Sequence, residues 1–75
     1  MRLEFPVAGR DFQAAGGAAQ KIKRTLRQIG IDAETARRVG IVAYEAEMNI
    51  VIHALSGKVG VDILPERINV FAYDQ

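Results

Sequence analysis

The stretch DAETARRVGIVAYEAEMNIVIHAL, residues 32–55, decides the fold because it carries the longest helical pattern in the chain. Asp32 is a preferred N-cap residue, and Glu34 in the first turn suits the positive end of the helix dipole. The Ser-Gly pair at 56–57 stops the pattern. We expect one helix that runs to Leu55 and, at about 1.5 Å per residue, is roughly 34 Å long.

The segments around this helix predict a second helix and three strands. Residues 1–7, MRLEFPV, alternate in polarity as an edge strand does, and Asp11 is a candidate N-cap for a helix over residues 12–29. Residues 58–64 and 67–73 are rich in Val and Ile, and the Pro between them sets a hairpin turn. The order β-α-α-β-β predicts an α+β fold, a two-layer α/β sandwich with an antiparallel hairpin.

Composition limits the classes of function. A chain of 75 residues forms one small domain at most, and a core of that size commonly needs a partner or further sequence. The charges are nearly balanced, so a direct nucleic-acid partner is not expected. The weak evidence for a DNA-binding helix is one group of basic residues: Lys21, Lys23, Arg24 and Arg27. The absence of Cys, of a signal peptide and of a bilayer-spanning stretch predicts a cytoplasmic protein with no membrane partner.

Glu45, Asn49 and His53 recur four residues apart and form one polar line on the long helix. A carboxylate among apolar neighbours can acquire the pKa of a general base, and an amide oxygen suits a hard cation such as Mg²⁺. A solvated polar stripe without chemistry is the simpler alternative, and zinc is disfavoured because the chain has one His. Glu47 lies off the line, on the Gly40 side, where we expect a surface role.

The segment YEAEMNIVIHA, residues 44–54, resembles the N-box of the GHKL ATP-binding superfamily, in which Glu is followed by Asn and often by His at intervals of four. Residues 11–32 and 37–54 resemble, more narrowly, bacterial anti-sigma regulatory factors of the serine-protein-kinase type. The resemblance extends over essentially the whole chain. It implies that residues 1–75 are the N-terminal half of a histidine-kinase-like ATP-binding domain. The Bergerat-type fold would be incomplete here, because FAYDQ at residues 71–75 matches only the start of the first glycine box.

The resemblance also implies a role for four side chains. Glu45 would orient or deprotonate the attacking hydroxyl, Asn49 would hold Mg²⁺, and His53 would lie near the nucleotide. Asp74 would accept a hydrogen bond from the adenine amino group. ATP and Mg²⁺ are the implied cofactors of the complete domain. Its implied activity is phosphorylation of a serine on a small antagonist protein, together with binding of a sigma factor or a related regulator.

The sequence leaves open whether the chain is a piece of a longer kinase or a naturally short protein. In the second case the alternative function is a non-catalytic, dimerising interaction module. We expect a homodimer or larger assembly in either case, because the hairpin has an apolar face beside which the chain supplies no further strand. The residues of that face are Val59, Val61, Ile63, Ile68, Val70 and Ala72.

Overall fold

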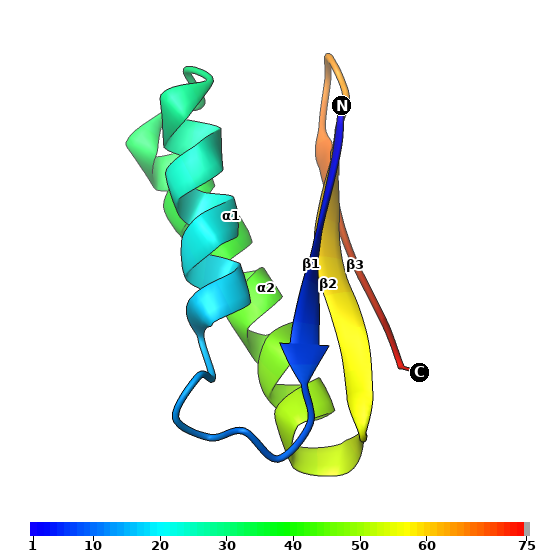
Figure 1. The fold of residues 1–75 in the computed structure, drawn as a ribbon. Helices are drawn as coiled ribbons and strands as arrows, with labels where there is room; N and C mark the ends of the chain where they lie inside the picture. The colour runs from blue at the N-terminus through cyan, green and yellow to red at the C-terminus, as the bar shows by residue number, and fades with distance from the viewer. Residues whose placement is uncertain (75) are drawn as a thin grey trace.

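Two helices pack against one face of a three-stranded antiparallel sheet in the computed structural model, which describes residues 1–74 (Figure 1). Along the chain the elements are β1 (Arg2–Ala8), α1 (Gly17–Gln28), α2 (Ala33–His53), β2 (Ser56–Ile63) and β3 (Ile68–Asp74). The order β-α-α-β-β and the α+β class that the sequence predicts are therefore confirmed.

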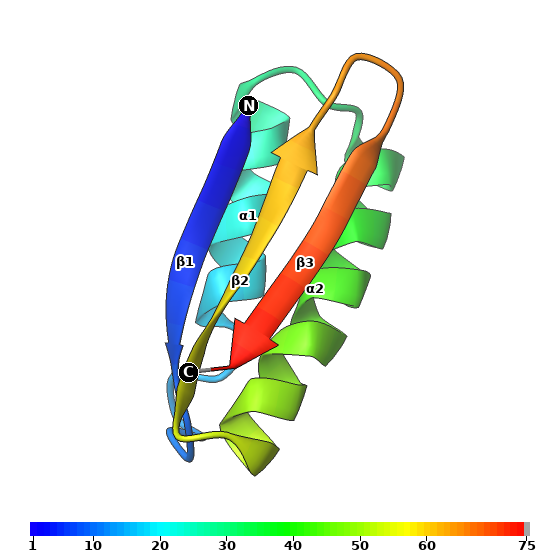
Figure 2. The same cartoon turned by 90° about the vertical axis from the view of Figure 1, so that its right-hand side faces the viewer.

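The sheet has the order β1-β2-β3, so β1 and β3 form its two edges (Figure 2). In the antiparallel register, Val61 of β2 lies opposite Leu3 on one side and Val70 on the other. Because side chains alternate along a strand, these apolar residues all face the helices and join the core. The turn between β2 and β3 closes with a hydrogen bond of 2.9 Å from the Leu64 amide to the Arg67 carbonyl.

The long helix α2 begins where the sequence predicts. A carboxylate oxygen of Asp32 accepts a hydrogen bond of 3.0 Å from the Thr35 amide, and hydrogen bonding to Thr35 lowers the pKa of Asp32. The helix ends at His53, two residues before the predicted Leu55. Within residues 1–74, neither helix is both long and apolar enough to cross a membrane. The largest fully buried side chains come from both layers: Ile22, Leu26, Ile50, Val51, Val59 and Val61.

The prediction that α1 begins at residue 12 is wrong, because the helix begins at Gly17. Gly16 has a φ of 95°, in the left-handed region, and a right-handed helix cannot pass through that conformation. Asp11 does accept a hydrogen bond of 3.1 Å from the Ala14 amide, but this bond orders a turn that precedes the helix. Phe12, which falls in the segment predicted as helical, is 61% exposed.

The apolar face of the β2–β3 hairpin is covered by the helices. Val59 and Val61 are fully buried there, whereas Val70 of β3 is half-buried and Ala72 is exposed. The predicted apolar face is therefore present, and its β2 residues belong to the core. Exposed apolar residues of the hairpin lie in the edge strand β3 and in the turn, where Leu64 is 40% exposed.

A polar and aromatic cluster on the outer face of the sheet joins its two edges. The Tyr73 hydroxyl donates a hydrogen bond of 3.0 Å to Glu4, and Arg2 donates one of 3.1 Å to the same carboxylate. The bond with Tyr73 lowers the pKa of Glu4 and raises the pKa of Tyr73. The Arg2 guanidinium also lies 4.1 Å from the centre of the Phe71 ring. These contacts cross β2 at Gly60, where any Cβ would collide with Phe71.

Candidate functional site

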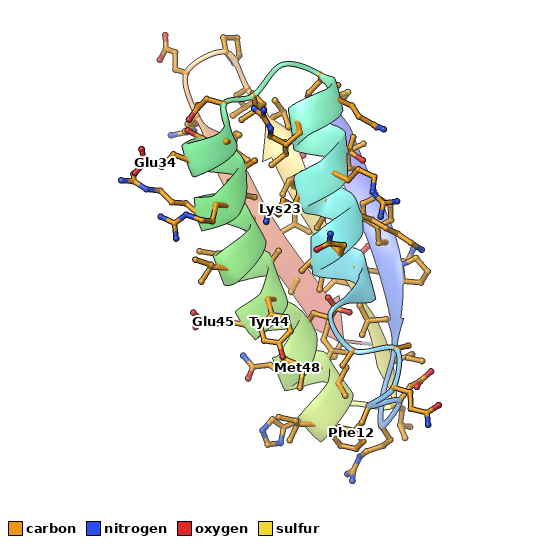
Figure 3. The ribbon with its side chains drawn as sticks, turned by 90° about the vertical axis from the view of Figure 1, so that its left-hand side faces the viewer. Phe12, Lys23, Glu34, Tyr44, Glu45 and Met48 are labelled. Carbon is orange, nitrogen blue, oxygen red and sulfur yellow. The ribbon has the colours of Figure 1, made fainter. Side chains whose placement is uncertain are left out.

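The polar line of Glu45, Asn49 and His53 lies on the solvent-exposed side of α2. Glu45 points away from α1 (Figure 3). None of the three side chains takes part in a hydrogen bond or ion pair within residues 1–74. The helical spacing brings them to one side of α2, and their polar atoms are open to water or to a ligand.

Exposed apolar side chains surround this line. Ile41, Val42, Tyr44 and Ile52 are 48%, 52%, 48% and 42% exposed. A helix face that is only solvated normally carries charged and polar residues. The outer face of α2 therefore has the composition of a surface that another group covers.

Asp74 ends β3 at the end of the molecule where α2 also ends (Figure 2). It lies opposite Gly57 in the sheet, and Gly57 faces α2: a Cβ at Gly57 would lie 2.9 Å from Cδ1 of Ile50. No hydrogen bond or ion pair within residues 1–74 connects Asp74 with the polar line. The structure thus groups Glu45, Asn49 and His53 on one side of α2. Asp74 lies in β3, at the end of the molecule where α2 also ends.

A preformed metal site is not part of this surface. No three His, Asp or Glu side chains gather into a metal-binding group among residues 1–74. Asn49 offers one neutral oxygen, and Mg²⁺ in proteins usually completes its coordination with water and phosphate oxygens. Asn49 therefore fits a Mg²⁺ site only where phosphate groups bring the metal with them.

Glu47 is the functional residue that sequence reasoning placed wrongly. It is 2% exposed, not at the surface. Its carboxylate accepts hydrogen bonds from the amides of Gly16 (2.9 Å), Ala18 (3.2 Å) and Ala19 (2.8 Å). The first turn of a helix leaves such amides without partners, and Gly16 at the N-cap position has no side chain to accept from them. Glu47 of α2 therefore caps α1 from the neighbouring helix.

This cap closes the N-terminus of α1 to other anions. The Gly17 amide donates to the Ala14 carbonyl at 3.1 Å, and the amides on either side of it donate to Glu47. Helix N-termini bind phosphate when these donors are free. A phosphate has no open donors at this helix end while Glu47 is in place.

A groove of about 580 Å³ lies between α1 and α2. Gly40 leaves room for the Lys23 stem, which passes 3.6 Å from where a Cβ at Gly40 would be. Gly16 in the same way leaves room for the Tyr44 ring, because a Cβ at Gly16 would lie 3.3 Å from that ring. Glu45 borders the groove. Sequence reasoning missed this groove because it arises only from the pairing of the two helices.

Comparison of the chain with protein-family models, with curated proteins and with solved structures gave no match. The case for a function therefore rests on the residues of the chain itself and on their arrangement.

Proposed function

We propose that this chain supplies the α2 side of the nucleotide site in a protein-serine kinase domain of the anti-sigma type. Such a domain phosphorylates a small antagonist protein and thereby regulates a sigma factor. The observation that carries the proposal is the polar line on α2, which is exposed among apolar neighbours that are themselves exposed. The pattern of the residues supports it, because Glu45, Asn49 and His53 match the Glu, Asn and His of the N-box pattern at intervals of four.

Glu45 is the candidate general base. Its side chain is exposed and points away from α1, so an acceptor hydroxyl can reach it (Figure 3). The carboxylate would accept a hydrogen bond from the serine hydroxyl, orient its oxygen for attack and take its proton during phosphoryl transfer.

The other three residues act in binding. Asn49, one turn beyond Glu45, would hold Mg²⁺ through its amide oxygen, and the metal would offset the charge of the phosphate groups. His53, one turn further, and Asp74 would bind the nucleotide, with the Asp74 carboxylate accepting from the adenine amino group. ATP supplies the phosphoryl group when it is bound.

This chain alone should bind Mg-ATP weakly. The first-turn amides of α1, which are typical phosphate donors, are engaged by Glu47. Several charge-assisted hydrogen bonds to phosphate are therefore missing from the site that residues 1–74 can form. Calorimetry should show no binding or a Kd of about a millimolar. A micromolar Kd for the isolated chain would show that the phosphate site lies elsewhere.

The catalytic assignment is tested in a protein in which this chain is followed by the family's lid and glycine boxes. Glu45→Gln should keep nucleotide binding and lower phosphoryl transfer by about 10²-fold or more. Asn49→Ala should weaken Mg-ATP binding itself, because it removes a metal ligand. The control is Glu34→Gln, an exposed acid of the same helix whose weak pair with Arg38 is 3.4 Å long. Glu47 is unsuitable as a control because it is buried and caps α1. Equal, mild effects at Glu45 and Glu34 would contradict a catalytic role.

The exposed apolar residues of α2 favour a second candidate, a non-catalytic interaction module. In that case the polar line is solvated and the surrounding apolar residues bind another protein subunit. Loss of subunit association in apolar variants, with no effect of Glu45→Gln on phosphoryl transfer, would support this candidate.

A further inference from the structure

Two glycines line the groove between α1 and α2. A Cβ at Gly40 would lie 3.6 Å from the Lys23 side chain and a Cβ at Gly16 would lie 3.3 Å from the Tyr44 ring, so the glycines leave room for these side chains. Figure 3 shows Lys23 in the space between the two helices. The groove, about 580 Å³, is open to solvent and is lined by residues of both helices.

Basic side chains outnumber the one acidic side chain, Glu45, among the residues that line the groove. Lys23 of α1 and Arg37 of α2 both line it. Neither takes part in the ion pairs found among residues 1–74. Two basic side chains that face one groove without acidic partners attract an acidic group, and complementary charge fixes the register of a partner.

Apolar contact is available beside these charges. Ile41 and Tyr44 line the groove and are both 48% exposed, and Ala15 and Ala19 lie across from them on the α1 side. A helix that lies in a groove between two helices is held by apolar anchors at helical spacing. The groove therefore combines the apolar anchors and the charge that an amphipathic, acidic helix requires.

The groove also reaches the candidate base. Glu45 lines it, whereas Asn49 does not. Arg37 and Glu45 are eight residues apart on α2, so a rise of about 12 Å separates the basic end of the groove from the carboxylate. A protein segment anchored at Lys23 and Arg37 can thus extend to Glu45, while the far side of Glu45 remains open.

We infer that this groove binds an acidic amphipathic helix of the acceptor protein and so directs the phosphorylated serine toward Glu45. The inference rests on the proposed kinase function for the identity of the partner. The docking itself rests only on the groove. Its basic residues bind acidic side chains of the helix, and Ile41 and Tyr44 bind the apolar stripe.

The test uses the 75-residue chain and three designed helical peptides in the absence of nucleotide. The peptides share one Leu and Ala stripe and differ at two adjacent positions, which are both Glu, both Gln or both Lys. We expect the Glu peptide to bind about tenfold more tightly than the Gln peptide in fluorescence anisotropy. NMR shifts on binding should centre on Gly16, Gly40 and Tyr44.

Charge reversal supplies the matched control. The double variant K23E/R37E should lose the preference for the Glu peptide and prefer the Lys peptide. The variant R24E/R38E makes the same change of net charge at residues outside the groove and should keep the original preference. The neutral variant K23Q/R37Q separates loss of charge from loss of fold, because it should bind the Glu and Gln peptides equally.

Three results would overturn the docking surface: no binding of any peptide, no preference in the unaltered chain, or equal loss of preference in R24E/R38E. Because nucleotide is absent, none of these results depends on the kinase activity. Peptide binding without any effect of Glu45→Gln on phosphoryl transfer would retain the docking surface and reject the kinase function.

Discussion

Oε1 of Glu47 lies 2.8 Å from the amide nitrogen of Ala19, and this contact fastens the middle of α2 to the first turn of α1. We expect Glu47→Ala to lower the free energy of unfolding by about 2–4 kcal/mol, because it leaves buried amides without an acceptor. Glu47→Gln should cost about 1–2 kcal/mol, since one acceptor oxygen remains but its charge is lost. Urea denaturation monitored by circular dichroism measures both values.

The control for this prediction is Glu45→Ala on the same helix. Glu45 is exposed, so its replacement should change the free energy of unfolding by less than about 0.5 kcal/mol. Similar losses at positions 45 and 47 would contradict the capping role of Glu47.

The two adjacent glycines before α1 should respond oppositely to alanine. Gly16→Ala should destabilise the fold by about 1–2 kcal/mol, because residue 16 has a positive φ and its Cβ would lie 3.3 Å from the Tyr44 ring. Gly17→Ala should stabilise it by about 0.4–1 kcal/mol, because no atom lies within 4 Å of the new methyl group and the unfolded chain loses freedom. Thermal unfolding of the two variants distinguishes these effects, and a shift of the same sign in both would refute the argument.

The bond between Tyr73 and Glu4 should appear in titrations. In the folded chain the pKa of Glu4 lies below its ordinary value of 4.5, mainly because Tyr73 donates to the carboxylate. Tyr73→Phe should therefore raise the pKa of Glu4, which carboxyl carbon shifts in NMR can follow. An unchanged pKa of Glu4 in this variant would show that the bond is not formed in solution.

The hydrogen bond between Tyr73 and Glu4 should stabilise the fold over a limited range of pH. A lowered carboxyl pKa contributes stability above its ordinary value of 4.5, and this contribution is lost as pH falls through the folded-state pKa. The raised pKa of Tyr73 contributes below its ordinary value of 10.0, and that contribution is lost as pH rises through the folded-state pKa. The difference in stability between Tyr73→Phe and the unaltered chain should be largest between these two limits.

Self-association remains a prediction, and the structure moves its expected site to the junction of α2 and β3. Val42 is 52% exposed there and shares a groove of about 520 Å³ with Ile68 and Val70. β3 has no charged residue from position 68 to 73, whereas charged residues and Pro commonly protect a free sheet edge. Sedimentation should show a dimer or larger species whose fraction rises with concentration.

Val42→Lys should shift this equilibrium to monomer. Ile41→Lys is the control, because Ile41 is equally apolar but lines the groove on the α1 side. A chain that is monomeric at high concentration, or variants with equal effects, would rule out this interface.

The features that depend only on residues close in sequence were predictable. Asp32 caps α2 with its own side chain, and the spacing of Glu45 and Asn49 needs only the helical period to place them together. Residues 12–16 were not predictable by the same means, because Asp11 and the apolar spacing favour a helix that the left-handed Gly16 interrupts. The helical spacing of apolar residues does not show that the backbone leaves the helical conformation at Gly16.

The misplacement of Glu47 has a different cause, because its partners are 28 to 31 residues away in sequence. Two signals were nevertheless present. A helix start at Gly16 and Gly17 offers no side-chain acceptor, and Glu47 falls on the side of α2 that carries the small residues Gly40 and Ala43. An acid on a close-packed helix face requires a partner, and an uncapped helix start can provide one.

The distant cap on α1 sets an order for folding. Asp32 and Thr35 let α2 form its first turn from its own residues, but the first turn of α1 lacks an acceptor until Glu47 arrives beside it. Helix nucleation is the costly step, and α1 has 12 residues, near the length at which an isolated helix is marginal. α1 should therefore become helical only as it docks on α2, so that the two helices form as one cooperative unit and α1 owes its order to an acid in the second half of α2.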